Sequence, residues 1–193
     1  MEPNQLELFS AAQPASTRKN RPDVLLMDAD ALVRWKGQIA AHQQRTRENK
    51  PAQQVTLLDF AEFDFAPAHC DPDRIDPFSL RLCPTLFYRL PVDGAGEACI
   101  YFVLDNAAGL ILYIGETCHS SKRWKGTHDC KRYIEKYQDL HYQYGLKTAV
   151  TMAFWWDAPA KAQPRQQLEQ ALIQKWKSPF NKENWQRWGQ PFG

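Results

Sequence analysis

Two apolar runs separated by a short polar break lie in the middle of the chain. Residues 99–104 and 110–114 are rich in β-branched and aromatic residues, and the break between them reads Asp-Asn-Ala-Ala-Gly. Short apolar runs joined by turn-forming residues are typical of two antiparallel strands. The pattern therefore predicts a β-hairpin. A third run of strand-forming residues, 148–156, predicts a third strand.

A first helix is expected well before the hairpin. Its apolar positions recur at helical spacing and are Leu32, Trp35 and Ile39. Asp28 and Asp30 are both suitable N-caps, and basic residues at 45 and 47 complement the negative end of the helix dipole. The pattern predicts a helix that begins at one of these two aspartates and runs to about residue 47.

Two helical regions are expected after the hairpin. Residues 120–145 predict a helix in two pieces, with the interruption near Gly126, and residues 163–177 predict a second helix. The apolar stripe of the second helix is Leu168, Leu172 and Trp176. The order of elements, β-β-α-α-β-α, predicts an α/β domain with a small three-stranded antiparallel sheet flanked by helices.

The chain divides into three parts by composition. Residues 1–22 contain few apolar residues and are expected to form a disordered tail. Residues 23–96 hold the first helix and a connector rich in turn-forming residues, which we expect to pack irregularly on the core. Residues 97–193 contain all the other predicted elements and are expected to form the main domain.

Composition excludes several classes of protein. The 193 residues are 44% hydrophobic and 24% charged, which is typical of globular proteins. There is no apolar run of about 18 residues, the length that spans a membrane. The N-terminus lacks the basic and apolar regions of a secretory signal. We therefore expect a cytoplasmic protein that acts near the nucleoid and not at a membrane.

The five cysteines have no paired C-x-x-C spacing. A disulfide framework and a closed zinc site both usually show such spacing. Cys118-His119 together with His128 and Cys130 is a conceivable zinc set, but reduced, mostly buried thiols are the favoured interpretation.

Basic residues are concentrated just after the hairpin, although the net charge is only +2. They are Lys122, Arg123, Lys125, Lys131, Arg132 and Lys136. A basic strip of this kind suits a phosphate-bearing ligand. On charge alone, a solvated helix face is an equally good interpretation.

Two tripeptides on the predicted hairpin resemble the motifs of the GIY-YIG nuclease superfamily. The first is Cys99-Ile100-Tyr101, with cysteine in place of the glycine of the motif, and the second is Tyr113-Ile114-Gly115. The resemblance extends over about residues 97–184. Arg123 lies eight residues after Gly115, where the family has an arginine, and Glu169 and Asn181 match a helical glutamate and a following asparagine.

The resemblance implies a metal-dependent DNA endonuclease, and the residue types fit that chemistry. Arg123 would grip the phosphate with its planar fork. Glu169 is a candidate ligand for magnesium (or manganese), since one carboxylate plus waters suits a hard, hydrated cation. A phenol with a solution pKa of about 10 needs nearby positive charge to act as a base. The family assigns that role to a motif tyrosine, here Tyr101 or Tyr113.

Further positions complete the expected site. Gly115, Lys122, Lys125 and Asn181 are candidate substrate-binding residues. Gly115 and Asn181 would equally suit a strand end and a turn. His128 lies one residue beyond a position where members often have histidine or tyrosine, so it is either a base, a phosphate contact or a surface histidine. Glu116 replaces a lysine that some members carry after the second motif.

Two functions from different classes follow from these residues. The favoured one is a DNA endonuclease that selects its substrate by DNA structure and is linked to replication, repair or recombination. The alternative is a non-catalytic DNA-binding or scaffolding module that retained the fold. The sequence does not indicate whether the DNA is a junction, a lesion, a specific site or foreign.

A pentapeptide in the tail resembles the motif by which bacterial replication and repair proteins bind the sliding clamp. It contains Gln5, Leu6, Leu8 and Phe9. Such a peptide delivers a Leu-Phe plug into an apolar pocket, while the glutamine hydrogen-bonds at the rim. The otherwise polar surroundings favour a clamp tether over an unused apolar tail.

Replacing both Leu8 and Phe9 with alanine is expected to weaken clamp binding by about tenfold or more. Each fully buried apolar side chain contributes roughly 1.5 to 3 kcal/mol, and 1.4 kcal/mol is a tenfold change. Fluorescence titration of the sliding clamp against the two proteins measures the effect. Cleavage of short naked DNA serves as the control and should not change. Equal affinities would remove the clamp from this interpretation.

Overall fold

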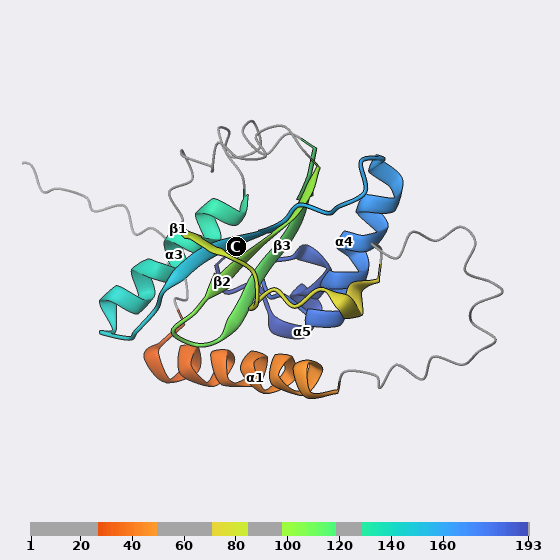
Figure 1. Cartoon of the computed structure of the whole chain (residues 1–193). Helices are drawn as coiled ribbons and strands as arrows, with labels where there is room; N and C mark the ends of the chain where they lie inside the picture. The colour runs from red at the N-terminus through yellow and green to blue at the C-terminus, as the bar shows by residue number, and fades with distance from the viewer. Residues whose placement is uncertain (1–26, 50–70, 85–97, 119–128, 193) are drawn as a thin grey trace, which may run out of the picture.

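A computed structural model describes residues 27–49, 71–84, 98–118 and 129–192 of the chain (Figure 1). Its elements are α1 (Ala29–Glu48), η3 (Pro72–Arg74), β1 (Leu82–Pro84), β2 (Cys99–Asp105), β3 (Leu110–Thr117), α3 (Asp129–Gln143), β4 (Val150–Trp155), α4 (Ala162–Trp176), η4 (Lys182–Asn184) and α5 (Trp185–Trp188). None of the described helices has the length and apolar character needed to cross a membrane.

The sheet is antiparallel and contains the predicted hairpin and third strand. The strand order is β1-β4-β2-β3. The mixed α/β fold with a preceding helix is thus confirmed, but the expected number of three strands was wrong. The fourth strand, β1, comes from the connector and pairs with β4, with Leu82 opposite Ala153. Three residues are too few to show alternation, and Pro84 lacks an N–H donor, which restricts such a strand to a sheet edge.

Helices cover both faces of this sheet. One face packs against α1, α3 and the C-terminal segment, through residues such as Leu32, Tyr137 and Phe192. The other face packs against α4, through residues such as Leu168 and Leu172. Every residue of β2 is buried as a result. This explains why the sequence of β2 is apolar from Cys99 to Leu104 and does not alternate.

The helix predictions are confirmed wherever the structure describes them. Asp28, and not Asp30, is the N-cap of α1, because its Oδ1 accepts a hydrogen bond of 2.7 Å from the N–H of Ala31. Helix α4 buries the predicted Leu168, Leu172 and Trp176. Of the two helical pieces expected at 120–145, α3 accounts for the second. The break near Gly126 and the tail at 1–22 lie outside the described residues.

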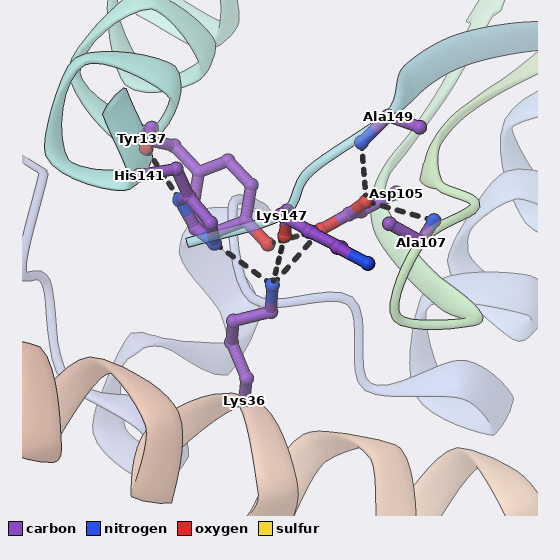
Figure 2. A network of polar contacts seen from close by, with 7 residues as sticks. All are labelled: Lys36, Asp105, Ala107, Tyr137, His141, Lys147 and Ala149. Carbon is purple, nitrogen blue, oxygen red and sulfur yellow. Dashed lines mark hydrogen bonds and ion pairs between the residues drawn. The ribbon is translucent and has the colours of Figure 1, made fainter. Parts of the chain in front are cut away.

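A buried polar network holds α1 against the turn end of the hairpin (Figure 2). Lys36 of α1 donates to Oδ2 of Asp105, at 3.1 Å, and to Nε2 of His141, at 2.8 Å. The hydroxyl of Tyr137 also donates to Oδ2 of Asp105, at 2.7 Å. The backbone N–H groups of Ala107 and Ala149 donate to Oδ1. One carboxylate therefore joins α1, α3, the hairpin turn and the start of β4.

The network fixes the protonation state of its members. Burial alone would raise the pKa of Asp105, but the hydrogen bonds from Tyr137 and Ala149 and the charge of Lys36 hold it below its usual value. Burial lowers the pKa of His141, and the charge of Lys36 lowers it further. Since Nε2 of His141 accepts from an ammonium group, Nδ1 carries the proton and donates to the carbonyl of Tyr137, at 2.7 Å.

Acidification from pH 7.5 to 5.5 is expected to destabilise the wild-type protein partly through His141. Because the folded state holds this imidazole neutral, the unfolded chain binds an extra proton below its pKa of about 6.5. The stability contribution is complete above that pH and is lost as the pH falls. The His141→Gln variant should lose less stability over this range, as measured by urea unfolding at several pH values. Identical pH slopes in the two proteins would show that His141 does not titrate on unfolding.

Candidate active site

The register of the hairpin places the two motif tyrosines on one face of the sheet. Tyr101 lies opposite Gly115, and Tyr113 lies opposite Val103. The two phenol rings stack with their centroids 6.0 Å apart. Tyr101 is fully buried, whereas Tyr113 is only half-buried.

Gly115 provides the space that the ring of Tyr101 occupies. A Cβ atom at position 115 would lie 2.3 Å from both Cζ and Oη of Tyr101. No real Cβ tolerates such a contact, so a side chain is excluded here by the neighbouring phenol and not by the backbone conformation. The Tyr-Ile-Gly motif of β3 and the tyrosine of β2 therefore form one packing unit.

Cys99 stands where the family motif has glycine. Its side chain is fully buried in the core between the sheet and α3. Burial raises the pKa of the thiol to about 12. The thiol therefore stays protonated at neutral pH and contributes to packing, since only the thiolate is a good nucleophile or metal ligand.

Helix α4, which packs on the opposite face of the sheet, brings Glu169 to the end of β3 that contains Gly115. The helix runs alongside β3 (Figure 1) and contacts it along the sheet edge. Oε1 of Glu169 accepts a hydrogen bond of 3.0 Å from the backbone N–H of Glu116. Glu169 is half-buried beside the apolar stripe of α4, as its helical position predicts. Tyr101 and Glu169 thus reach adjacent residues of β3.

Asn181 is fixed to the same strand. Its Oδ1 accepts from the N–H of Ile114, at 3.0 Å, and its Nδ2 donates to the carbonyl of Ile114, at 2.8 Å. The hydroxyl of Ser178 donates to the same Oδ1, at 2.6 Å. With only 4% of its surface exposed, Asn181 acts on the backbone of the Tyr-Ile-Gly motif.

These contacts belong to a continuous closure of the outer edge of β3. Toward the turn, the amide of Gln43 of α1 bonds to both the N–H and the carbonyl of Ile111. The carbonyl of Leu112, the extra residue of a β-bulge, accepts from the N–H of Phe180. An edge strand leaves its outward-facing backbone groups unpaired. Here the side chains of Gln43, Asn181 and Glu169 and the backbone N–H of Phe180 pair such groups.

Glu116 is neutralised by an arginine that the sequence analysis did not identify. Nε of Arg165 donates to Oε2 of Glu116, at 2.5 Å. Nη1 of Arg165 donates to the carbonyls of Pro159 and Ala160, at 2.9 and 2.8 Å. The side chain of Arg165 is only 3% exposed and that of Glu116 19%. Its position in the sequence could have indicated a buried arginine, because Arg165 lies three residues before Leu168 and therefore on the apolar stripe of α4.

Several candidate site residues lie outside the described residues. They are Lys122, Arg123, Lys125 and His128, and with them the whole peptide that contains Gln5, Leu6, Leu8 and Phe9. Their roles remain predictions from the sequence. His119 also lies outside, so the alternative of a zinc site with Cys118 is not tested.

Glu169 is a candidate ligand for a divalent cation among the described residues. No group of three or more potential metal ligands from His, Cys, Asp and Glu occurs among them. Glu169 has a carboxylate oriented by the N–H of Glu116. One oriented carboxylate with water completing the shell is a common arrangement for magnesium.

Comparison with known families agrees with this geometry. No curated protein and no solved structure matches the chain. Residues 97–184 match the family model described as the GIY-YIG catalytic domain. A domain of this family is a nuclease domain and typically uses a divalent metal, so nucleic acid is the implied substrate. The chain therefore carries a GIY-YIG catalytic domain, a nuclease domain, in the same residues that gather Tyr101, Tyr113 and Glu169 around the end of β3.

Proposed function

We propose that this protein is a metal-dependent DNA endonuclease that recognises DNA structure and acts in replication, repair or recombination. The observation that carries the proposal is the placement of three side chains around one end of β3, with the two tyrosines on the face that α3 covers and Glu169 on α4, which covers the opposite face. Tyr101 lies over Gly115, Tyr113 stacks on Tyr101, and Glu169 bonds to Glu116. The family match supplies the class of chemistry, phosphodiester hydrolysis.

The exposure of the two tyrosines supports different roles for them. Tyr101 has no exposed surface, so its phenol cannot meet water or substrate without a rearrangement. Tyr113 is only half-buried. We assign proton removal from the attacking water to Tyr113, and we assign the orientation of the Tyr113 ring to Tyr101.

The remaining residues would bind the phosphate and the metal. Arg123, Lys122 and Lys125 would neutralise the phosphoryl oxygens, and His128 would contact the phosphate or assist the base. Glu169 would hold magnesium or manganese, which supplies Lewis acidity and stabilises the leaving oxygen. Gly115 and Asn181 would act through β3, the first by giving Tyr101 room and the second by fixing the backbone of Ile114.

The tail would connect this chemistry to DNA replication. The peptide from Gln5 to Phe9 precedes a stretch of low apolar content that ends near residue 22. A spacer of this composition would let a short peptide reach a sliding clamp without displacing the nuclease domain. The proposal rests on the sequence of the peptide alone.

Replacing Glu169 with alanine is expected to abolish magnesium-dependent cleavage while leaving DNA binding largely intact. The substitution removes the metal ligand but none of the proposed phosphate contacts. Magnesium-dependent cleavage is measured on branched, nicked and plain duplex DNA with and without magnesium. DNA binding is measured by fluorescence anisotropy in EDTA. Glu183→Ala, which changes an exposed glutamate in η4, is the matched control. Wild-type rates in Glu169→Ala would exclude the proposed metal ligand.

Replacing Gly115 with alanine is expected to destabilise the protein and to suppress cleavage. The added methyl group must displace the ring of Tyr101, and overpacking of this kind costs about 1–3 kcal/mol. Urea unfolding and cleavage rates measure the two effects. Gly37→Ala is the control, because a Cβ at this position of α1 meets nothing within 4 Å. Unchanged stability in Gly115→Ala would mean that Tyr101 does not occupy this space in solution.

A further inference from the structure

A closed loop of contacts connects Arg165, Glu116 and Glu169. The guanidinium of Arg165 bonds to the carboxylate of Glu116, and the backbone N–H of Glu116 bonds to the carboxylate of Glu169. Arg165 and Glu169 are four residues apart on α4, so they are neighbours on one side of the helix. The helix therefore contacts the end of β3 at two points one turn apart. Two such contacts fix both the position and the rotation of α4 at Glu169.

Arg165 also fixes the segment that leads into α4. Its Nη1 bonds to the carbonyls of Pro159 and Ala160, just before the helix begins at Ala162. The N-cap residue of α4, Lys161, makes no side-chain capping bond. Arg165 thus provides, from inside the helix, an anchor for its first turn. A single buried side chain links the loop, the helix and β3.

The same pair sets the charge around Glu169. Without Arg165, the carboxylates of Glu116 and Glu169 would add two negative charges at the end of β3. Without Glu116, an arginine with only 3% of its side chain exposed would remain as an uncompensated cation beside the metal ligand. Charges at such poorly solvated positions interact more strongly than they would in bulk water. The pair is neutral only when both members are present.

We infer that the Arg165–Glu116 pair sets the electrostatic environment of Glu169: its two opposite charges cancel beside this carboxylate, so that the pair neither weakens nor strengthens metal binding there. This inference rests on the proposed role of Glu169 in holding the metal. Neither residue touches the substrate in this role. Both act through Glu169, so the predicted primary effect is on metal affinity, and any effect on the cleavage rate follows from it.

The test uses two single variants that change the charge with opposite signs. In Glu116→Gln, the backbone N–H that contacts Glu169 and an oxygen that can accept from Arg165 are kept, but a negative charge is lost. In Arg165→Gln, a positive charge is lost. The first variant should bind Mn²⁺ more weakly and the second more tightly, each by about threefold to tenfold. The double variant should return close to the wild-type affinity, because its net charge is restored.

Mn²⁺ binding to the full-length chain is measured without DNA, from the loss of the electron paramagnetic resonance signal of free Mn²⁺. Glu169→Ala identifies the site, since it should abolish this binding. The magnesium concentration for half-maximal cleavage and the thermal midpoint are measured in parallel. A purely structural role would lower the midpoint of both single variants without moving their metal affinities in opposite directions.

The outcomes separate the two levels of the interpretation. If the wild type neither binds Mn²⁺ nor cleaves DNA, the proposed function is wrong. If the wild type does both, and the single variants shift Mn²⁺ affinity in the same direction or not at all, the inference is wrong. Should Arg165→Gln fail to fold, Glu116→Gln decides alone: weaker Mn²⁺ binding supports the inference, and unchanged binding overturns it.

Discussion

The outer edge of β3 must be closed, and the organisation of the site follows from how this is done. A free edge exposes backbone N–H and carbonyl groups that would otherwise pair with water or another chain. In this protein Gln43, Asn181 and Glu169 supply the partners, from α1, the segment after α4, and α4 itself. A residue that closes the edge is necessarily held next to the strand. Structural closure and the placement of the candidate metal ligand are therefore one set of contacts.

The edge contacts also explain why α1 is integrated with the nuclease domain. The family match begins at residue 97, yet Gln43 and Lys36 of α1 make buried polar contacts with β3 and with the end of β2. Gln43 also donates to the carbonyl of Trp176 at the end of α4, at 3.1 Å. Removing α1 would take away the partners of Ile111 and Trp176 and would expose the core surface that Leu32 and Ile39 cover. The structural unit is larger than the segment that the family model covers.

Periodicity was sufficient to predict the elements with long apolar patterns. The short apolar runs predicted the hairpin, and apolar positions at helical spacing predicted α1 and α4. β1 escaped because Leu82–Pro84 is too short to carry a pattern. In the candidate site, the motifs of the family that the chain resembles predicted which elements carry Tyr101, Tyr113 and Glu169, and their roles stay predictions. Arg165 was not predicted, because an arginine on a buried stripe is explained only by a partner, Glu116, that is distant in sequence.

The packing of Tyr101 against Gly115 constrains how this sequence can change over generations. Any side chain at position 115 would collide with the phenol of Tyr101, so a substitution of Gly115 is unfavourable while Tyr101 is present. Shrinking Tyr101 first would empty the space above the glycine and leave a cavity, with a loss of stability of its own. Every single-step path between this pair and another one passes through a less stable intermediate. Neutral drift at the two positions is therefore blocked, whether or not either residue takes part in the chemistry.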